Sequence, residues 1–135
     1  MIDKDTIRFR HWSLKVGRID PATGEALNVV GEIVAAVDDL HQSIVNLILT
    51  QKGSVPTEPE KGVDYEGAID RHPDVAIPLL TREIWDALSI WEPRIVVQKV
   101  AIAMVEFAHF STRVFWRPIE SVIDDLRVTE VAYRA

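Results

Sequence analysis

The sequence contains no cysteine, so neither a disulfide framework nor a thiolate metal site is available to it. It also lacks long apolar runs: no stretch approaches the roughly 20 residues that cross a bilayer, and residues 1–5 (MIDKD) are too polar for a secretory signal peptide. Basic residues are in deficit, with 15 Lys and Arg against 21 Asp and Glu and a net charge of −6. Because phosphate binding needs a basic surface, nucleic acid is not an expected partner. We therefore expect a protein that assembles inside the cell, without a membrane or nucleic-acid partner.

What is present fits one folded domain. The 135 residues are 47% hydrophobic and 27% charged, which is typical of a globular chain that buries its own core. We expect a single domain over 1–135, with an N-terminal hairpin arm at 1–37 and an α+β core at 38–135.

The N-terminal arm has the pattern of a β-hairpin. Residues 6–19 are rich in aromatic and branched side chains, residues 20–24 (DPATG) are a strong turn signal, and residues 27–37 are apolar again. The second arm should lead into the first helix. Basic residues also make this end locally positive, which usually marks a solvated face, with contact to an acidic partner as the alternative; they are Lys4, Arg8, Arg10, Lys15 and Arg18.

A first helix is predicted over about 38–51. Asp39 followed by Gln42 fits a capping box at its start, and Gly53 is placed to end it as a left-handed cap. The apolar residues that recur at helical spacing predict a buried stripe, and they are Leu40, Ile44, Leu47 and Ile48.

Residues 54–73 predict a surface loop that is broken by proline and concentrates acid at Glu58, Glu60, Asp64, Glu66 and Asp70. A paired-carboxylate hydrolase needs one carboxyl to be desolvated, so that its pKa rises. This stretch has nothing apolar to bury one. A solvated acidic loop is therefore the better interpretation, with a hydrolase site as the alternative.

The remaining pattern predicts an α+β fold, with a small antiparallel sheet packed on two helices. Pro78 opens a second helix over about 78–91, in which Leu80, Ile84, Leu88 and Trp91 follow at three- and four-residue steps. A central strand follows at about 94–109, with neighbours at 111–118 and 126–134 and a connection at 119–125 that is compatible with a helix. Residues 100–105 of the long strand are apolar on both alternating faces, which indicates a strand that is central or is covered by another chain.

The two elements meet at Trp91-Glu92-Pro93-Arg94-Ile95. A residue before proline is driven out of the helical region, so the helix should end near Trp91 and Glu92 should be extended. Glu92 and Arg94 then project to the same side. Taken alone, this predicts a helix stop with an exposed ion pair worth ~0 to 1 kcal/mol.

No other pattern in the chain points to chemistry. The histidines at 11, 41, 72 and 109 lack metal-ligand spacing. The sequence has no Gly-rich phosphate loop, no nucleophile elbow and no internal repeat. We expect neither a metal nor a cofactor.

Two blocks of sequence resemble one known family. The first runs from Asp39-Leu40-His41-Gln42-Ser43-Ile44 to Gly53-Ser54, and the second joins Ala87-Leu88 to residues 91–95; residues 68–71 (AIDR) resemble the family's middle loop. The resemblance is to the small baseplate-wedge and sheath-initiator proteins of contractile phage tails (gene 25-like and W-like proteins), with their counterpart in the type VI secretion baseplate. It covers about residues 30–110. Residues 58–62 (EPEKG) depart from the family's arginine-containing loop, which puts that arginine's contacts in doubt here.

The resemblance implies a structural protein and not an enzyme. It implies a place in the tail baseplate of a virion assembled in the host cytoplasm, in several copies, between the wedge and tube base and the first sheath ring. Partners would be other wedge proteins, sheath subunits and the tube or hub base, joined by β-strand addition to an open sheet edge. It assigns the wedge-assembly corner to Glu92, Pro93 and Arg94. The supporting residues would be Trp91, Gln42, Thr50 and Gly53.

We expect Arg94→Ala to leave the isolated fold almost intact and to block particle assembly. A muralytic enzyme that uses the loop carboxylates, a type VI secretion subunit and an unrelated α+β interaction domain remain as alternatives.

Overall fold

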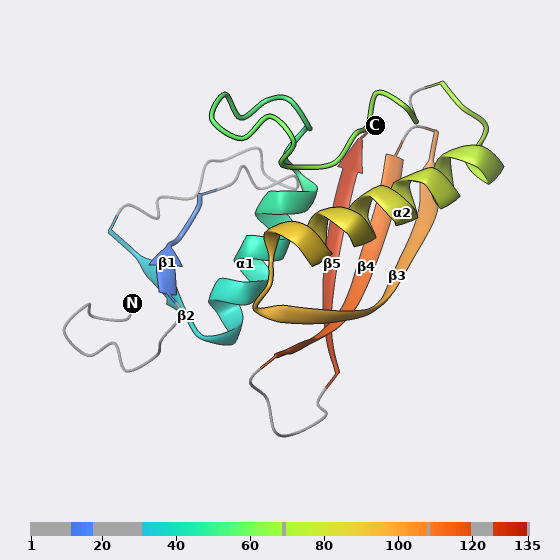
Figure 1. Cartoon of the computed structure of the whole chain (residues 1–135). Helices are drawn as coiled ribbons and strands as arrows, with labels where there is room; N and C mark the ends of the chain where they lie inside the picture. Colours follow the sequence, from blue (N-terminus) through green and yellow to red (C-terminus); the bar gives the residue numbers. More distant parts are fainter. Residues whose placement is uncertain (1–11, 18–30, 69, 108, 120–125, 135) are drawn as a thin grey trace. The chain divides into compact units, whose positions relative to one another are not determined.

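In the computed structural model, two short strands near the N-terminus are followed by two helices and then by three longer strands (Figure 1). The structure describes residues 12–17, 31–68, 70–107, 109–119 and 126–134. In chain order the elements are β1 (Trp12–Leu14), β2 (Ile33–Ala35), α1 (Val37–Ile48), α2 (Pro73–Trp91), β3 (Ile95–Glu106), β4 (His109–Pro118) and β5 (Arg127–Arg134). The predicted α+β class is confirmed. The chain divides into two compact units, residues 1–42 and residues 43–135.

The first unit contains the predicted hairpin. β1 and β2 pair in antiparallel fashion with Ser13 opposite Val34. Each described strand is three residues long, and residues 6–11, 18–19 and 27–30 of the predicted arms lie outside the described residues. The predicted turn at 20–24, and Lys4, Arg8, Arg10 and Arg18, lie outside the described residues.

The capping-box prediction for the first helix is wrong. Ala36 has a positive φ of 55° and separates β2 from α1, so the helix already begins at Val37 and Asp39 lies inside its first turn. There Asp39 accepts a hydrogen bond from the Ser13 hydroxyl at 2.5 Å. The Asp39 carboxylate thus bonds to the hairpin, whereas a capping box would bond it to a backbone N–H of its own helix. α1 also ends at Ile48, three residues before the predicted end at 51.

The second unit is built on a three-stranded antiparallel sheet with the strand order β3-β4-β5. The strand predicted as central, about 94–109, is therefore an edge strand, and β4 is in the middle. Two successive antiparallel hairpins place the second strand between its neighbours. β3 also ends at Glu106, and β4 begins at His109, two residues before the predicted start.

Helix α2 covers one face of this sheet (Figure 1), packing mainly on β3. The β4 residues on the face that α2 covers are buried along the strand as far as Trp116; they are Phe110, Thr112, Val114 and Trp116. Trp116 donates from its indole Nε1 to the Thr129 hydroxyl at 2.8 Å, so its polar atom is satisfied inside the core.

The second helix begins at Pro73, five residues before the predicted start. His72 caps it, accepting at Nδ1 a hydrogen bond from the Asp74 N–H at 3.3 Å. Proline is well tolerated at the first helical position, so Pro73 is the opener and Pro78 lies within the helix. Of the predicted apolar stripe, Leu80, Ile84 and Leu88 have no exposed surface, whereas Trp91 at the end of the helix is half-buried.

No helix within the described ranges is long and apolar enough to cross a membrane.

Candidate functional site

The candidate site is the turn between α2 and β3. Helix α2 ends at Trp91, as predicted, and Glu92 follows with φ −125° and ψ 75°, outside the helical region. The Glu92 N–H still donates to the Leu88 carbonyl at 3.0 Å, which closes the last turn of the helix. Pro93 is exposed and cannot continue the helix. The local sequence therefore forces the chain to turn sharply here.

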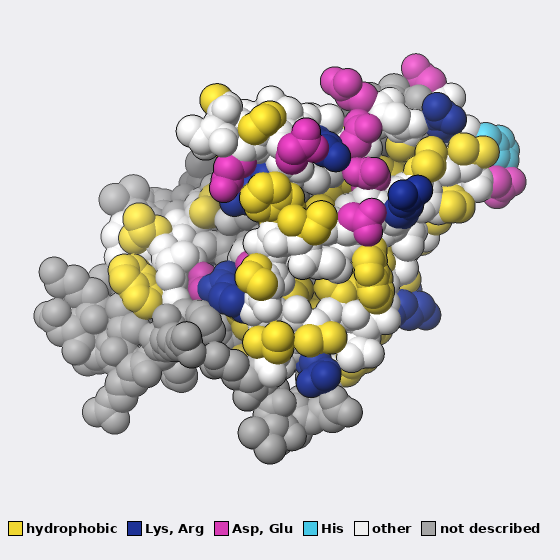
Figure 2. All heavy atoms as spheres, in the orientation of Figure 1, with side chains coloured by type: hydrophobic (Ala, Val, Ile, Leu, Met, Phe, Trp, Pro, Cys, Tyr) yellow, Lys and Arg dark blue, Asp and Glu magenta, His cyan; other side chains and the backbone are white. Residues whose placement is uncertain are grey.

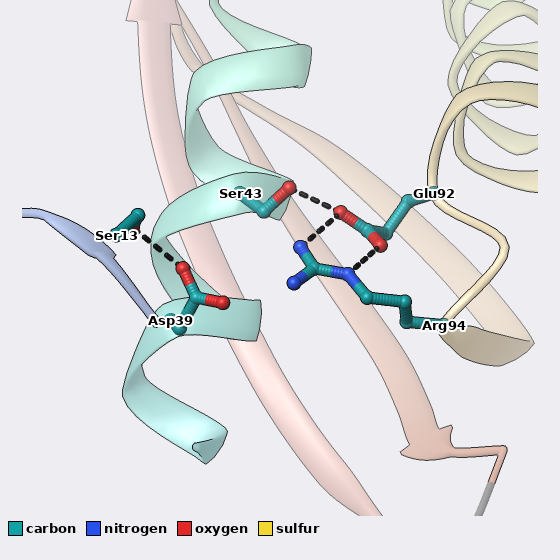
Figure 3. Close-up of polar contacts among 5 residues, drawn as sticks. All are labelled: Ser13, Asp39, Ser43, Glu92 and Arg94. Atoms are coloured by element: carbon teal, nitrogen blue, oxygen red, sulfur yellow. Dashed lines mark hydrogen bonds and ion pairs between the residues drawn. The ribbon is translucent and has the colours of Figure 1, made fainter. Parts of the chain in front are cut away.

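The side chains of Glu92 and Arg94 point to the same side and form a bidentate pair, as Figure 3 shows. Arg94 Nε lies 2.6 Å from Glu92 Oε1, and Nη2 lies 2.9 Å from Oε2. The Ser43 hydroxyl of α1 also donates to Glu92 Oε2. One carboxylate therefore ties together the end of α2, the start of β3 and the Ser43 turn of α1.

Glu92 is buried, with 4% of its surface exposed, whereas 30% of the Arg94 side chain is exposed. The pair is therefore not the exposed one that the sequence predicted, and the value of ~0 to 1 kcal/mol does not apply to it. The expectation that Arg94→Ala leaves the fold almost intact is corrected accordingly. Three hydrogen bonds hold the buried Glu92 carboxylate: two come from Arg94, and one comes from Ser43, which lies 49 residues away in the sequence.

Burial by itself raises the pKa of Glu92, but the hydrogen bonds from Arg94 and Ser43 and the Arg94 charge outweigh it, so the pKa lies below its ordinary value. Glu92 is thus held ionised. A general acid needs the opposite shift. The corner is suited to fixing geometry and presenting a guanidinium, and not to proton transfer.

Of the predicted supporting residues, Trp91 is the one next to the corner. Its half-buried ring faces Lys61, whose Nζ lies 5.7 Å from the ring centroid. Lys61 also pairs with Glu58 at 3.3 Å. Through Lys61, the acidic loop that contains Glu58 contacts the end of α2.

Thr50 and Gly53 belong to the loop after α1. Gly53 has the predicted positive φ, 88°, but it stands five residues after the helix end and turns the loop, donating to the Pro59 carbonyl at 2.8 Å. The Thr50 hydroxyl donates to the Asn46 carbonyl at 2.7 Å. No hydrogen bond or ion pair joins either residue to the corner within the part of the chain that the structure describes.

Gln42 serves the hairpin of the first unit. Its amide nitrogen donates to the Ser13 hydroxyl at 3.0 Å and the Leu14 carbonyl at 2.8 Å, and its oxygen accepts from the Val16 N–H at 2.9 Å. Gln42 therefore holds β1 along the first part of α1.

Sequence reasoning missed two residues. Ser43 lies in the first resembling block, but no local spacing connects it with Glu92. Gly62 has φ 113°, and a Cβ there would meet the Thr50 carbonyl oxygen at 2.4 Å. Only glycine fits that approach, and no local pattern marks it, because Gly62 is followed by Val63 and then by the charged Asp64.

Four of the five loop carboxylates are exposed, and Asp64 is half-buried. Glu58 and Glu60 are both exposed and pair with Lys61 and Lys52. Over the described ranges, no group of three or more His, Asp or Glu residues could hold a metal ion.

No protein-family model matches the sequence. No curated protein matches it either. Solved structures do match. A protein from Geobacter sulfurreducens, provisionally named a tail lysozyme, superposes with a TM-score of 0.66 at 19% identity, covering 75% of this chain and 92% of that one.

Two further matches are chains within baseplates. A chain of the anti-feeding prophage baseplate has a TM-score of 0.53 at 18% identity, covering 92% of this chain and 85% of that one. A chain of the type VI secretion baseplate complex has a TM-score of 0.50 at 21% identity, covering 73% and 89%. The family resemblance is thus confirmed at the level of the fold: this chain has the fold of baseplate proteins from contractile, tail-like systems and of the protein named as a tail lysozyme.

Proposed function

We propose that this chain is a structural component of a contractile tail baseplate, in which it joins the wedge and tube base to the first sheath ring. The observation that carries the proposal is the fold shared with two baseplate chains, one of them matched over 92% of this chain. The proposed partners are other wedge proteins, sheath subunits and the tube or hub base. The chain would lie in several copies around the tail axis of a particle assembled in the host cytoplasm, and a type VI secretion baseplate is the variant setting.

The corner is the proposed wedge contact. Glu92 is neutralised from within its own unit, while Arg94 keeps 30% of its side chain exposed beside the exposed Pro93. In this proposal a partner surface packs against Pro93 and the exposed part of the Arg94 side chain at the interface. Truncating one member of a desolvated charge pair at an interface costs ~2 to 5 kcal/mol of binding.

The sheet offers the proposed strand-accepting edge. β3 and β5 each have one side that pairs with no other described strand. β3 is interrupted by register shifts between Val97 and Lys99 and between Met104 and Glu106, whereas the β4–β5 pairing is regular over all eight residues of β5. Because bulges disturb the alternation of donors and acceptors, we assign strand addition to β5.

The test is complementation of a strain whose own copy is deleted, with sheathed particles counted by electron microscopy. We expect the wild-type chain to restore them, and Arg94→Ala to reduce them strongly at matched levels of folded protein. Ser43→Ala is the control, since it removes a bond to the same carboxylate but leaves the Arg94 side chain in place. Equal counts for all three proteins would remove the corner from the function, and particles formed without the chain would refute the structural role.

A muralytic activity is the second candidate, because one matching structure carries a lysozyme name. It would need a desolvated acid, whereas Glu58 and Glu60 are exposed and paired with lysines. Purified protein that clears a peptidoglycan suspension, with loss of clearing in Glu58→Gln or Glu60→Gln, would favour the enzyme.

A further inference from the structure

One edge of the β1 segment is closed by a side chain of α1. On its other edge the segment pairs with β2, where the Lys15 N–H donates to the Glu32 carbonyl at 3.0 Å. Because antiparallel pairing uses alternate residues, the backbone groups of Leu14 and Val16 point away from β2. There the Leu14 carbonyl accepts from Gln42 Nε2 at 2.8 Å, and the Val16 N–H donates to Gln42 Oε1 at 2.9 Å. One carboxamide thus occupies two groups to which a further strand would bond.

The orientation of this carboxamide is fixed by Asp39. The Ser13 hydroxyl donates its single hydrogen to the Asp39 carboxylate (Figure 3), so the hydroxyl oxygen can only accept from Gln42. It does so from Nε2 at 3.0 Å. The amide nitrogen must therefore face Ser13 and Leu14, and the amide oxygen must face the Val16 N–H. Asp39, which is 2% exposed, acts through Ser13 as a positioning residue for Gln42.

Without the carboxamide, this edge would be complementary to a second copy of itself. About a two-fold axis at Lys15, the Val16 N–H of each copy would meet the Leu14 carbonyl of the other. Leu14 would also lie opposite Val16 of the second copy, and these apolar side chains are 65% and 48% exposed. Figure 2 shows hydrophobic side chains at the surface over this hairpin. An open strand edge with such groups is a template for pairing with another chain.

The charge of Lys15 opposes the same pairing. Its side chain would stand opposite its own copy, and like charges directly across a strand pair are destabilising. Lys15 Nζ lies 3.1 Å from Glu32 Oε2, but the Lys15 side chain keeps 44% of its surface exposed. Lysine is a common means of protecting an edge strand. The β1 edge therefore carries two features that disfavour pairing, the Gln42 carboxamide and the Lys15 charge.

We propose that Gln42 is an edge guard, which keeps single chains from joining in two-fold pairs through their β1 segments. A two-fold pair is closed, so it would withdraw both hairpins from any other contact. The carboxamide suits this role because it supplies a donor and an acceptor together, whereas an ionised carboxylate supplies no donor. The guard acts in the chain before assembly, so it goes beyond the baseplate role and does not depend on it.

The experiment uses one introduced thiol, since the chain has no cysteine. Lys15→Cys in the full chain places this thiol at the proposed two-fold axis, where the opposed Cα atoms would lie about 4.5 Å apart, within disulfide range. The protein is held in a buffer of reduced and oxidised glutathione, and disulfide-linked dimer is measured on non-reducing gels. We expect Gln42→Met in this background to raise the dimer yield roughly tenfold, because methionine keeps the side-chain length and loses the bonds to the edge.

Three controls separate pairing at β1 from general association. Gln98→Met, the same change at an exposed position of β3, should leave the yield unchanged. With the reporter thiol moved to position 98 by Gln98→Cys, Gln42→Met should cause no rise. Val16→Pro, added to the Lys15→Cys, Gln42→Met protein, should return the yield to its starting level, because proline lacks the N–H that the pair needs.

The guard is overturned if the yield stays unchanged in both Gln42→Met and Gln42→Glu while each protein unfolds cooperatively in urea. A rise that is equal for thiols at positions 15 and 98, or one that persists with Val16→Pro, also overturns it. If one of the two variants fails to fold, the other decides. Failure of both to fold overturns the guard as well, because Gln42 would then be required for the fold itself. The baseplate role is tested separately by complementation, so it stands or falls without these results.

Discussion

Arg94→Ala should destabilise the isolated protein by about 2 to 3 kcal/mol at pH 7. The change deletes donors 2.6 and 2.9 Å from a carboxylate that is 4% exposed. Leaving a buried charge without a partner costs about 3 to 5 kcal/mol. The expected cost is smaller than 3 to 5 kcal/mol for two reasons. The Ser43 hydroxyl still donates to Glu92, and water can enter the space left by the Arg94 side chain, which is 30% exposed. The expected loss of melting temperature is about 6 to 12 °C.

The loss should depend on pH in a defined direction. In the wild-type protein the pKa of Glu92 is lowered, so its contribution is present above the unfolded pKa of about 4.5 and is lost as the pH falls through the folded value. In the variant, burial acts without the Arg94 bonds and favours the neutral carboxyl. The difference in unfolding free energy between the two proteins should therefore narrow from pH 7 to pH 4.

Urea unfolding followed by tryptophan fluorescence at the two pH values measures both effects. Arg82→Ala is the matched control, since that guanidinium is 79% exposed and lies 3.7 Å from Asp86, and we expect a change of about 0.5 kcal/mol or less. A loss for Arg94→Ala no larger than that control at pH 7, or one that does not shrink on acidification, would refute the reasoning.

Three further predictions concern the rest of the chain. Gly62→Ala should cost about 3 kcal/mol in urea unfolding, because its φ is 113° and the new Cβ would meet a backbone oxygen at 2.4 Å; Gly53→Ala, with open space around it, should cost only about 1 kcal/mol. Burial raises the pKa of Tyr65 and of Tyr133, so the folded protein should show little tyrosinate absorbance near pH 10 and lose stability as the pH rises above it; a normal titration curve would contradict this. Gln42→Ala removes three hydrogen bonds to the β1 segment, so hydrogen exchange should speed up there and stay unchanged in β4.

The elements that rest on short-range patterns could be predicted from sequence. The stop before Pro93 and the Leu80, Ile84 and Leu88 stripe follow from local sterics and helical spacing, and both are seen. The predicted start of the second helix at Pro78 was wrong by five residues, because Pro73 meets the same preference for proline in the first helical turn. The His72 cap makes Pro73 the start.

What depends on partners distant in sequence could not be predicted. The strand order needed the pairing of β4 with both neighbours, because an apolar run on both faces does not distinguish a central strand from an edge strand. For the same reason, the Glu92–Arg94 pair was foreseen but its burial and the Ser43 bond were not. The corner residues themselves came from the family resemblance, and their role in assembly stays a prediction.

The loop that follows α1 is closed at its base. Gln51 bridges to Val63, and the Val63 N–H donates to the Thr50 carbonyl at 2.9 Å, while residues 56–60 at the tip are exposed. A loop whose ends are already joined accepts extra length at small entropic cost, because closure entropy grows only with the logarithm of length. An epitope or a fluorescent module inserted after Thr57 should therefore leave the fold intact, giving a marker for tracing this subunit in whole particles.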